Sequence, residues 1–128
     1  MKYLLGSLDE LCKKLEFSFD ETVDEKDGLR YVNGVNVGKI DKGKYLWNIN
    51  LFRLVADAKN VLKLDKKKAF LFVCGRDVLD KKGIENKYYF VYDNDDNFLG
   101  IAVFNGKVFK NKLNIGIFID NSFGKDLV

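Results

Sequence analysis

The first stretch of helical periodicity lies near the start of the chain, at residues 8–15. Apolar side chains there fall at positions i, i+3, i+4 and i+7, which form one stripe and predict a helix over 8–15. Ser7 stands just before the stripe with Glu10 three residues later, which is the capping-box pattern of a helix N-terminus. Cys12 belongs to the stripe, so we expect it to be a buried core thiol.

A second helical stretch begins after Asn48 or Asn50, either of which can cap a helix. Its apolar spacing predicts a helix that ends near Lys59 or Asn60. Residues 61–64 then fit a short strand, although the apolar stripe also continues through them.

The charged segment Asp65–Lys68 predicts a joint between the two halves of the chain. The apolar run that follows, residues 69–74, fits a strand or a helix by periodicity alone. Gly83 closes this stretch, which favours a helix through Leu79 with the glycine beyond its end.

Turn signals separate the predicted strands. Asn33-Gly34 between apolar residues predicts a tight hairpin, and residues 44–47 fit a short strand. In the second half, Tyr88–Tyr92 and Phe98–Phe104 fit two strands that pair through a turn at Asp93–Asn97. A turn at Asn105-Gly106 and a strongly apolar last strand at Ile115–Ile119 complete an α+β pattern.

The composition excludes several classes of protein. The 128-residue chain has no histidine, which removes the commonest general base and zinc ligand. Its only cysteines, Cys12 and Cys74, cannot form a disulfide framework, and no apolar run approaches the ~20 residues of a membrane-spanning helix. We therefore expect a cytoplasmic protein with reduced thiols and no membrane partner.

Evidence for catalysis is weak in this sequence. Asp93, Asp95 and Asp96 look like a calcium loop, but the glycine and glutamate that such a loop needs do not follow, so a turn is the better interpretation. No phosphate-binding glycine motif occurs. We expect no catalytic residue, metal site or cofactor, and a hydrolase or transferase is the least favoured function.

The lysines carry more information than the mildly basic net charge of +3. They gather at Lys66–Lys68, in the pair before Gly83, and at Lys107, Lys110 and Lys112 around the predicted turn. Ammonium groups bind phosphates, and an exposed ring such as Phe109 can stack on an unpaired base. On composition alone, solvated loop lysines remain the simpler interpretation.

Three segments of the second half resemble a PUA domain, a fold named after pseudouridine synthases and archaeosine transglycosylases. They are FVCGRDVLDKKGI (residues 72–84), YYFVYDNDDNFLGIAV (residues 88–103) and IGIFIDNSFGKDLV (residues 115–128). The matching features are Gly75 with Val78-Leu79, Leu99-Gly100, and Asp120 with Gly124.

The preceding segment, VGKIDKGKYLWNINLFRLVADAKNVLKL (residues 37–64), is similar to the pre-PUA region of a small ribosome-biogenesis factor of archaea and eukaryotes. The matching features are Gly38-Lys39, the strand at 44–47, Ala58-Lys59 and the first PUA strand at 61–64. In eukaryotes this family assists maturation of the large ribosomal subunit, and its PUA domain binds RNA.

The resemblance implies a mixed α/β pre-PUA lobe over residues 1–59 and a mostly antiparallel β pseudobarrel of PUA type over residues 60–128. The implied function is non-catalytic RNA binding in ribosome biogenesis and rRNA processing, with rRNA or pre-rRNA as the partner and other ribosome-assembly or exosome proteins as further partners. A protein–protein adaptor or accessory subunit of an RNA-modifying or RNA-processing complex is the alternative.

The segment Gly106–Lys112 lies on a predicted turn between two PUA strands, where exposed side chains can converge on one ligand. The resembling family also has basic residues in this inter-strand segment. We therefore expect one basic face that holds single-stranded or irregular RNA. Its expected residues are Arg76, Lys107, Phe109, Lys110, Lys112 and Lys125.

Overall fold

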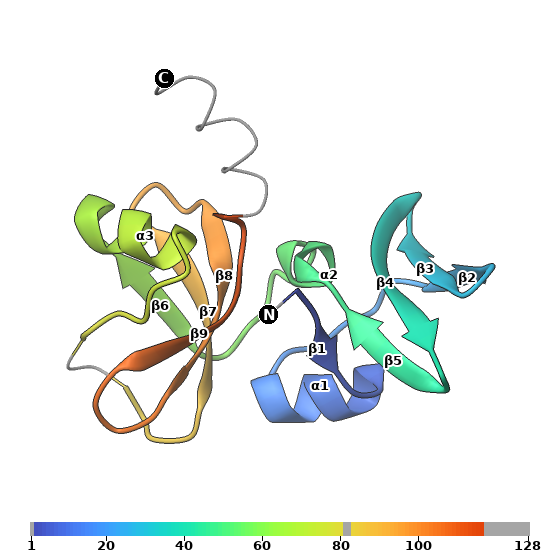
Figure 1. Ribbon diagram of the computed structural model, residues 1–128, viewed down its shortest axis with the longest axis horizontal. Helices are drawn as coiled ribbons and strands as arrows, with labels where there is room; N and C mark the ends of the chain where they lie inside the picture. Colours follow the sequence, from blue (N-terminus) through green and yellow to red (C-terminus); the bar gives the residue numbers. More distant parts are fainter. Residues whose placement is uncertain (1, 81–82, 117–128) are drawn as a thin grey trace. The chain divides into compact units, whose positions relative to one another are not determined.

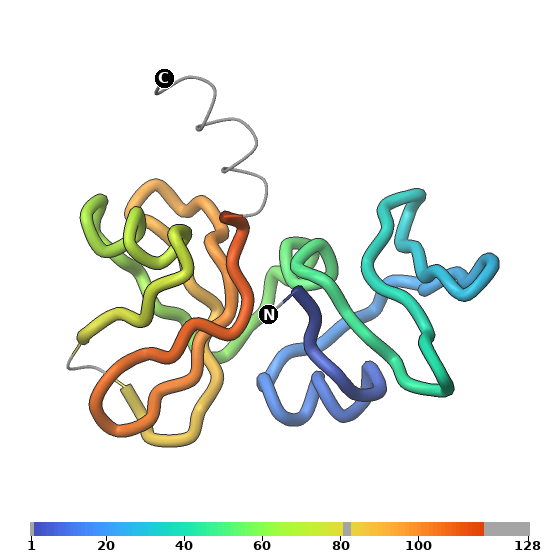
Figure 2. The backbone as a smooth tube through the Cα atoms, in the orientation of Figure 1, coloured from blue at the N-terminus to red at the C-terminus, as the bar shows by residue number. Residues whose placement is uncertain are grey.

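The computed structural model of the chain describes residues 2–80 and 83–116. The chain divides into two compact units, Met1–Asn60 and Val61–Val128, which we call unit 1 and unit 2 (Figures 1 and 2). Each unit is built on one sheet. Within the described ranges, every helix is too short or too polar to cross a membrane.

Unit 1 contains an antiparallel five-stranded sheet in the order β1-β5-β4-β3-β2. Its strands are β1 (Leu4–Leu5), β2 (Asp24–Lys26), β3 (Leu29–Val32), β4 (Val35–Asp41) and β5 (Lys44–Trp47). The predicted hairpin at Asn33-Gly34 is confirmed, since these two residues join β3 to β4 with φ of 49° and 80°. Positive φ at both positions is what a tight hairpin of this kind requires.

Two helices accompany this sheet, next to β1 in Figure 1. Helix α1 (Leu8–Leu15) has the predicted bounds, and the Ser7 hydroxyl accepts a hydrogen bond from the Glu10 N–H at 3.2 Å. Cys12 is only partly buried. Because Leu11 and Leu15 are the residues of α1 that are fully buried, the thiol lies at the margin of the core.

Helix α2 (Ile49–Arg53) begins after the Asn48 cap as predicted, but it ends at Arg53 and not near Lys59. The physical reason is tertiary hydrogen bonding. The Lys59 N–H donates to the Glu16 carbonyl at 3.0 Å, and the Asp57 carboxylate accepts from the Ser18 N–H at 3.2 Å. These bonds tie residues 57–59 to the segment after α1, so helical bonding does not continue.

Unit 2 contains a four-stranded sheet in the order β6-β7-β8-β9, in which β6 and β7 are parallel and the other pairs antiparallel. Its strands are β6 (Val61–Leu64), β7 (Tyr88–Asp93), β8 (Phe98–Phe104) and β9 (Phe109–Asn114). The predicted strands at 61–64, 88–92 and 98–104 and the turn at 93–97 are confirmed. Both units thus consist mainly of antiparallel strands with few helices.

Helix α3 (Lys66–Val73) contacts all four strands of unit 2 and buries Ala69, Phe72 and Val73 (Figure 1). The sheet keeps β6 and β9 as its edges, so strand pairing among the described residues does not close the expected pseudobarrel.

The prediction of a helix through Leu79 is wrong, and the segment expected to be a joint is the first turn of α3. Asp65 caps this helix, since its carboxylate accepts from the Lys68 N–H at 2.9 Å. The helix stops because the following segment bonds to β9 instead. Val78 and Phe109 exchange two backbone hydrogen bonds of 3.1 and 2.8 Å.

The last described strand, β9, lies where the sequence predicts an exposed turn segment. The predicted strand at 115–119 is wrong for its first two residues, because Ile115 lies in a turn and Gly116 is helical. Residues 117–119 lie outside the described ranges. β9 packs tightly on β8 at Gly100, where an added Cβ would lie 2.0 Å from the Leu113 carbonyl oxygen. Only glycine allows this approach.

Candidate nucleic-acid interface

The outer edge of β9 is organised around Asp77. One carboxylate oxygen accepts the Asn111 N–H at 2.8 Å, and the other pairs with the Lys110 ammonium at 2.9 Å. The Asn111 amide in turn donates to the carbonyls of Phe72 at 2.7 Å and Arg76 at 3.3 Å. The segment at 76–78 is therefore fixed along β9.

These contacts also set the charge of the edge. The backbone hydrogen bond from Asn111, followed by the hydrogen bond from Lys110 and the positive charge of Lys112, lowers the pKa of Asp77 below its usual range. Asp77 is thus anionic near neutral pH. Because Lys110 and Lys112 both act on this single carboxylate, and Arg76 directly precedes it in the chain, the edge carries a net positive charge.

The structure brings together only part of the predicted binding set. Lys110 and Lys112 lie by the Asp77 carboxylate, whereas Arg76 is exposed and is bonded to this edge through its backbone carbonyl. Lys107 is exposed in the turn between β8 and β9. Lys125 lies outside the described residues.

Phe109 cannot stack on a base, so this prediction is corrected. Its side chain is 0% exposed, with its ring centroid 4.7 Å from that of Phe104 and 5.1 Å from that of Tyr89. An aromatic residue beside a turn looks exposed in the sequence, but here it is the first residue of β9 and faces the core.

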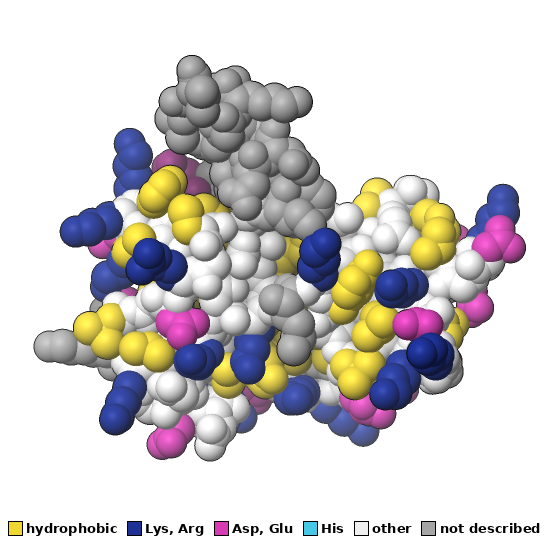
Figure 3. All heavy atoms as spheres, viewed as in Figure 1, with side chains coloured by type: hydrophobic (Ala, Val, Ile, Leu, Met, Phe, Trp, Pro, Cys, Tyr) yellow, Lys and Arg dark blue, Asp and Glu magenta, His cyan; other side chains and the backbone are white. Residues whose placement is uncertain are grey.

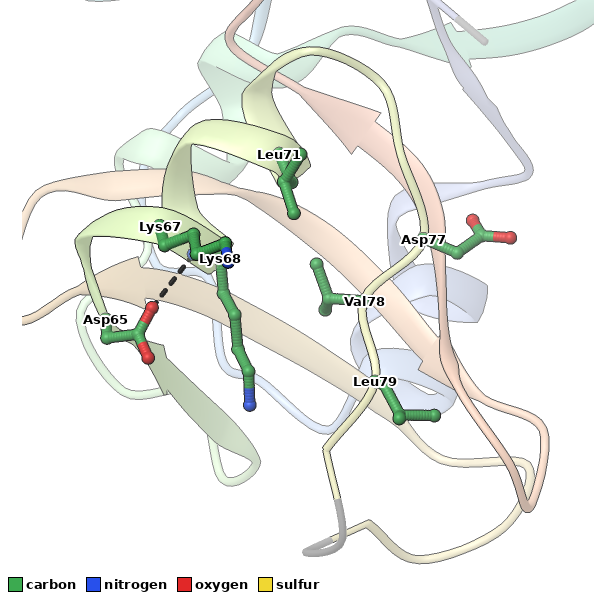
Figure 4. Close-up of a pocket in the computed structure, with 7 residues that line it drawn as sticks. All are labelled: Asp65, Lys67, Lys68, Leu71, Asp77, Val78 and Leu79. Carbon is green, nitrogen blue, oxygen red and sulfur yellow. Dashed lines mark hydrogen bonds between the residues drawn. The ribbon is translucent and has the colours of Figure 1, made fainter.

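A hollow of about 360 Å³ lies beside the Asp77 edge, between α3 and the segment at 77–79 (Figure 4). In Figure 4, Leu71 and Val78 face each other across it, while the Asp77 carboxylate points away. The lining residues are Asp65, Lys67, Lys68, Leu71, Asp77, Val78 and Leu79. The hollow therefore has apolar walls and a charged rim.

The first turn of α3 consists of Lys66, Lys67 and Lys68 and has no acidic residue. A helix N-terminus has a partial positive charge, which the Asp65 carboxylate partly offsets, so the three lysines leave the start of α3 basic. Lys68 is partly neutralised by Asp80, with the charged groups 3.8 Å apart. Several Lys and Arg side chains surround α3 in Figure 3.

An exposed aromatic residue that the sequence analysis missed, Phe70, lies on the same helix. It is 57% exposed and stands three and four residues after Lys67 and Lys66, so the three side chains share one face of α3. Asp65 was a usable N-cap signal for this helix, but residues 69–74 are apolar at every position, so the sequence pattern did not place Phe70 on the outer face.

The acidic cluster at 93–97 is a turn, as predicted. The Asp93 carboxylate accepts hydrogen bonds of 2.9 Å from the N–H groups of Asp95 and Asn97 and from the Asn97 amide. Over residues 2–80 and 83–116, no three His, Cys, Asp or Glu side chains are grouped so that they could hold a metal ion.

Comparison with known proteins shows the fold. No protein-family model and no curated protein matches the chain. Among solved structures, it is similar to a conserved PUA domain protein from Thermoplasma acidophilum, with a TM-score of 0.57 and 14% sequence identity over 94% of this chain and 99% of that chain. The chain thus shares the fold of a PUA domain protein, whereas the resemblance to a ribosome-biogenesis factor stays a prediction.

Proposed function

We propose that this protein is a non-catalytic RNA-binding protein that acts in ribosome assembly and binds rRNA or pre-rRNA through unit 2. The observation that carries the proposal is the placement of Lys110 and Lys112 by the Asp77 carboxylate, next to the exposed Arg76 and beside a hollow rimmed by Lys67 and Lys68. We call this surface, from the first turn of α3 to the outer side of β9, the basic edge.

The chemistry of the basic edge suits an extended polyanion. Its cations come from a helix, a connecting segment and a strand, so they are spread along a path and do not converge on one point. Each ammonium that meets a phosphate releases a counterion, which gives affinity with little dependence on base sequence. Phe70, exposed beside the α3 lysines, supplies the ring that can stack on an unpaired base.

Two properties of the chain support a non-catalytic role. The sequence contains no histidine, the residue most often used as a general base near neutral pH. Burial, reinforced by the charges of Asp9 and Asp57, raises the pKa of Cys12, so this thiol remains protonated and unreactive. We expect the purified protein to bind RNA without turning it over.

The role in ribosome assembly rests on the resemblance of residues 37–64 and of the PUA segments to the small ribosome-biogenesis factor. It is supported by the shared PUA fold. The test is whether the tagged protein sediments with large-subunit precursors from its own cells. Sedimentation only with free protein would contradict the assembly role while leaving RNA binding intact.

RNA binding itself is tested by titrating a labelled single-stranded RNA at several salt concentrations. The variant Lys67→Ala/Lys110→Ala/Lys112→Ala should bind more weakly, and the slope of log affinity against log salt should shrink by about 0.7 for each lost phosphate contact. The control, Lys13→Ala/Lys42→Ala/Lys44→Ala, removes the same charge from exposed positions of unit 1. Equal affinities and slopes for the two variants would show that the basic edge is merely solvated.

A further inference from the structure

A row of five side chains crosses the whole sheet of unit 1, with one residue from each strand. Successive members are direct partners in the antiparallel register, so all five project from the same face of the sheet. The row runs from β1 to β2 as Leu5, Leu46, Lys39, Leu29 and Lys26. We call it the Leu–Lys row.

The neighbouring row projects from the opposite face and defines the inner side of the sheet. Its members are Leu4, Trp47, Gly38, Arg30 and Glu25. Leu4 and Trp47 are buried in the core, and the Arg30 guanidinium reaches across Gly38 to lie 5.1 Å from the Trp47 ring centroid. The core of unit 1 therefore packs on this face.

The Leu–Lys row, in contrast, reaches solvent, since Leu5, Leu29 and Lys26 are exposed and Leu46 and Lys39 are partly exposed. Leu5 and Leu29 are 58% and 41% exposed. Tyr3 lies two residues before Leu5, on the same face, and its ring centroid is 5.1 Å from the Lys39 ammonium. This contact holds the central charge of the row in place between the leucines. Hydrophobic side chains interleaved with Lys and Arg are also visible on unit 1 in Figure 3.

We propose that the Leu–Lys row docks an amphipathic helix of a protein partner, with apolar residues against the leucines and Glu or Asp against Lys39 and Lys26. Neighbouring strands are about 4.8 Å apart, close to the pitch of about 5.4 Å of an α-helix. A helix laid across the five strands thus meets about one strand per turn, and about 13 residues span the row. Complementary charge sets its register.

Other occupants fit this face less well. Leucine side chains do not stack on bases. Asp24 and Asp41 flank the row on the same face, so a uniformly charged phosphate backbone would also meet these carboxylates, whereas a helix can place its acidic residues against Lys26 and Lys39 alone. A second copy of the chain, related by a twofold axis through the centre of the row, would place Lys39 against Lys39. The row therefore favours an acidic amphipathic helix.

The test is an NMR titration of the full chain, labelled with ¹⁵N, with a 14-residue helical peptide that carries leucines at i, i+3 and i+4 spacing flanked by glutamates. The control peptide has lysine at every glutamate position. The acidic peptide should bind at least about tenfold more tightly, a difference of about 1.4 kcal/mol. The largest shifts should occur in the amides of the Leu–Lys row.

Two variants sharpen the result. Lys39→Glu should reverse the preference between the peptides, whereas Lys13→Glu on the exposed side of α1 should leave it unchanged. Leu29→Ser should weaken the acidic peptide at least about fivefold, within the range of truncations at interface anchors. Both row variants should keep wild-type RNA affinity, which separates this proposal from RNA binding by unit 2.

Three outcomes would overturn the proposal. They are equal affinity for the acidic and the basic peptide, shifts that map away from the row, and no binding of the acidic peptide up to about 1 mM, the weak end of specific recognition. A loss of RNA affinity in Lys39→Glu beyond that in Lys13→Glu would instead make the row a nucleic-acid surface.

Discussion

Lysine side chains occupy two different settings in the two units. In unit 2, Lys110 and Lys112 lie at the edge of a sheet, around a carboxylate and beside a charged hollow. In unit 1, Lys26 and Lys39 alternate with leucines across the face of a sheet. The neighbours of a lysine, more than the number of lysines, indicate whether it suits a phosphate or an acidic helix.

The local structure explains this difference. The outer N–H groups of Phe109 and Asn111 in β9 are satisfied by Val78 and Asp77, and this pairing carries the basic residues to the sheet edge. On the sheet face of unit 1, direct cross-strand partners project from the same face, so Lys39 lies between Leu46 and Leu29. An edge built from several segments suits a flexible chain, whereas a row of side chains across one sheet face suits a rigid helix.

The largest expected effect comes from Phe109, the buried ring at the start of β9. Phe109→Ala should destabilise unit 2 by about 3–5 kcal/mol, the usual cost of removing a core phenylalanine. Urea unfolding followed by NMR signals of each unit measures this loss. If Phe109→Ala kept its stability but lost RNA affinity, the ring would be a stacking residue after all.

Two glycines with positive φ, Gly100 in unit 2 and Gly34 in unit 1, differ in how closely a neighbouring strand approaches them. Gly100→Ala should cost more than about 2 kcal/mol, because backbone strain of about 1–3 kcal/mol adds to the clash with the Leu113 carbonyl. Gly34→Ala should cost only about 1–2 kcal/mol, since no atom lies within 4 Å of its Cβ position. Equal losses of stability would show that the β8–β9 contact relaxes easily.

Phe70 allows an affinity effect to be separated from a stability effect. Phe70→Ala should weaken single-stranded RNA by about 1–3 kcal/mol, the usual contribution of one stacked base. Its free energy of unfolding should stay within about 0.5 kcal/mol of wild type, because the ring is exposed. Tyr45→Ala, an exposed ring of unit 1, is the matched control and should leave RNA affinity unchanged.

The smallest expected effect is the pH dependence of unit 2. The pKa of Asp77 is lowered in the folded state, so its contribution is present above the unfolded value of about 3.9 and is lost as pH falls through the folded value. Asp77→Asn should reduce this pH-dependent loss of unfolding free energy by up to about 1 kcal/mol, the usual size for an exposed ion pair. Between pH 6 and pH 2, the free energy of unfolding of unit 2 should therefore fall more in wild type than in Asp77→Asn, whereas that of unit 1 should change equally in both.

How much the sequence predicts depends on whether the signal is local. Ser7, Glu10 and Asn33-Gly34 act on neighbouring residues, so α1 and the β3–β4 hairpin were predicted correctly. The ends of α2 and α3 depend on Glu16 and Phe109, which are distant in sequence. Periodicity cannot contain such information.

The same limit applies to the candidate site. Arg76, Lys110 and Lys112 could be named as candidates because charge and motif are visible in the sequence, and their role in binding stays a prediction. Strand β9 was not predicted, because its lysines alternate with Asn111 where a buried strand would have an apolar residue. Asn111 can be partly buried since its amide donates to the distant Phe72 carbonyl. Without that strand, the direction of the Phe109 ring could not be predicted.

The most direct test of the account is one NMR titration of the ¹⁵N-labelled full chain with a single-stranded RNA oligonucleotide at low salt. The account predicts that amide shifts concentrate in Lys66–Leu79 and Phe109–Asn114, and that the amides of the Leu–Lys row do not respond. The largest shifts at Leu5, Leu29, Lys39 and Leu46, with a silent basic edge, would contradict it.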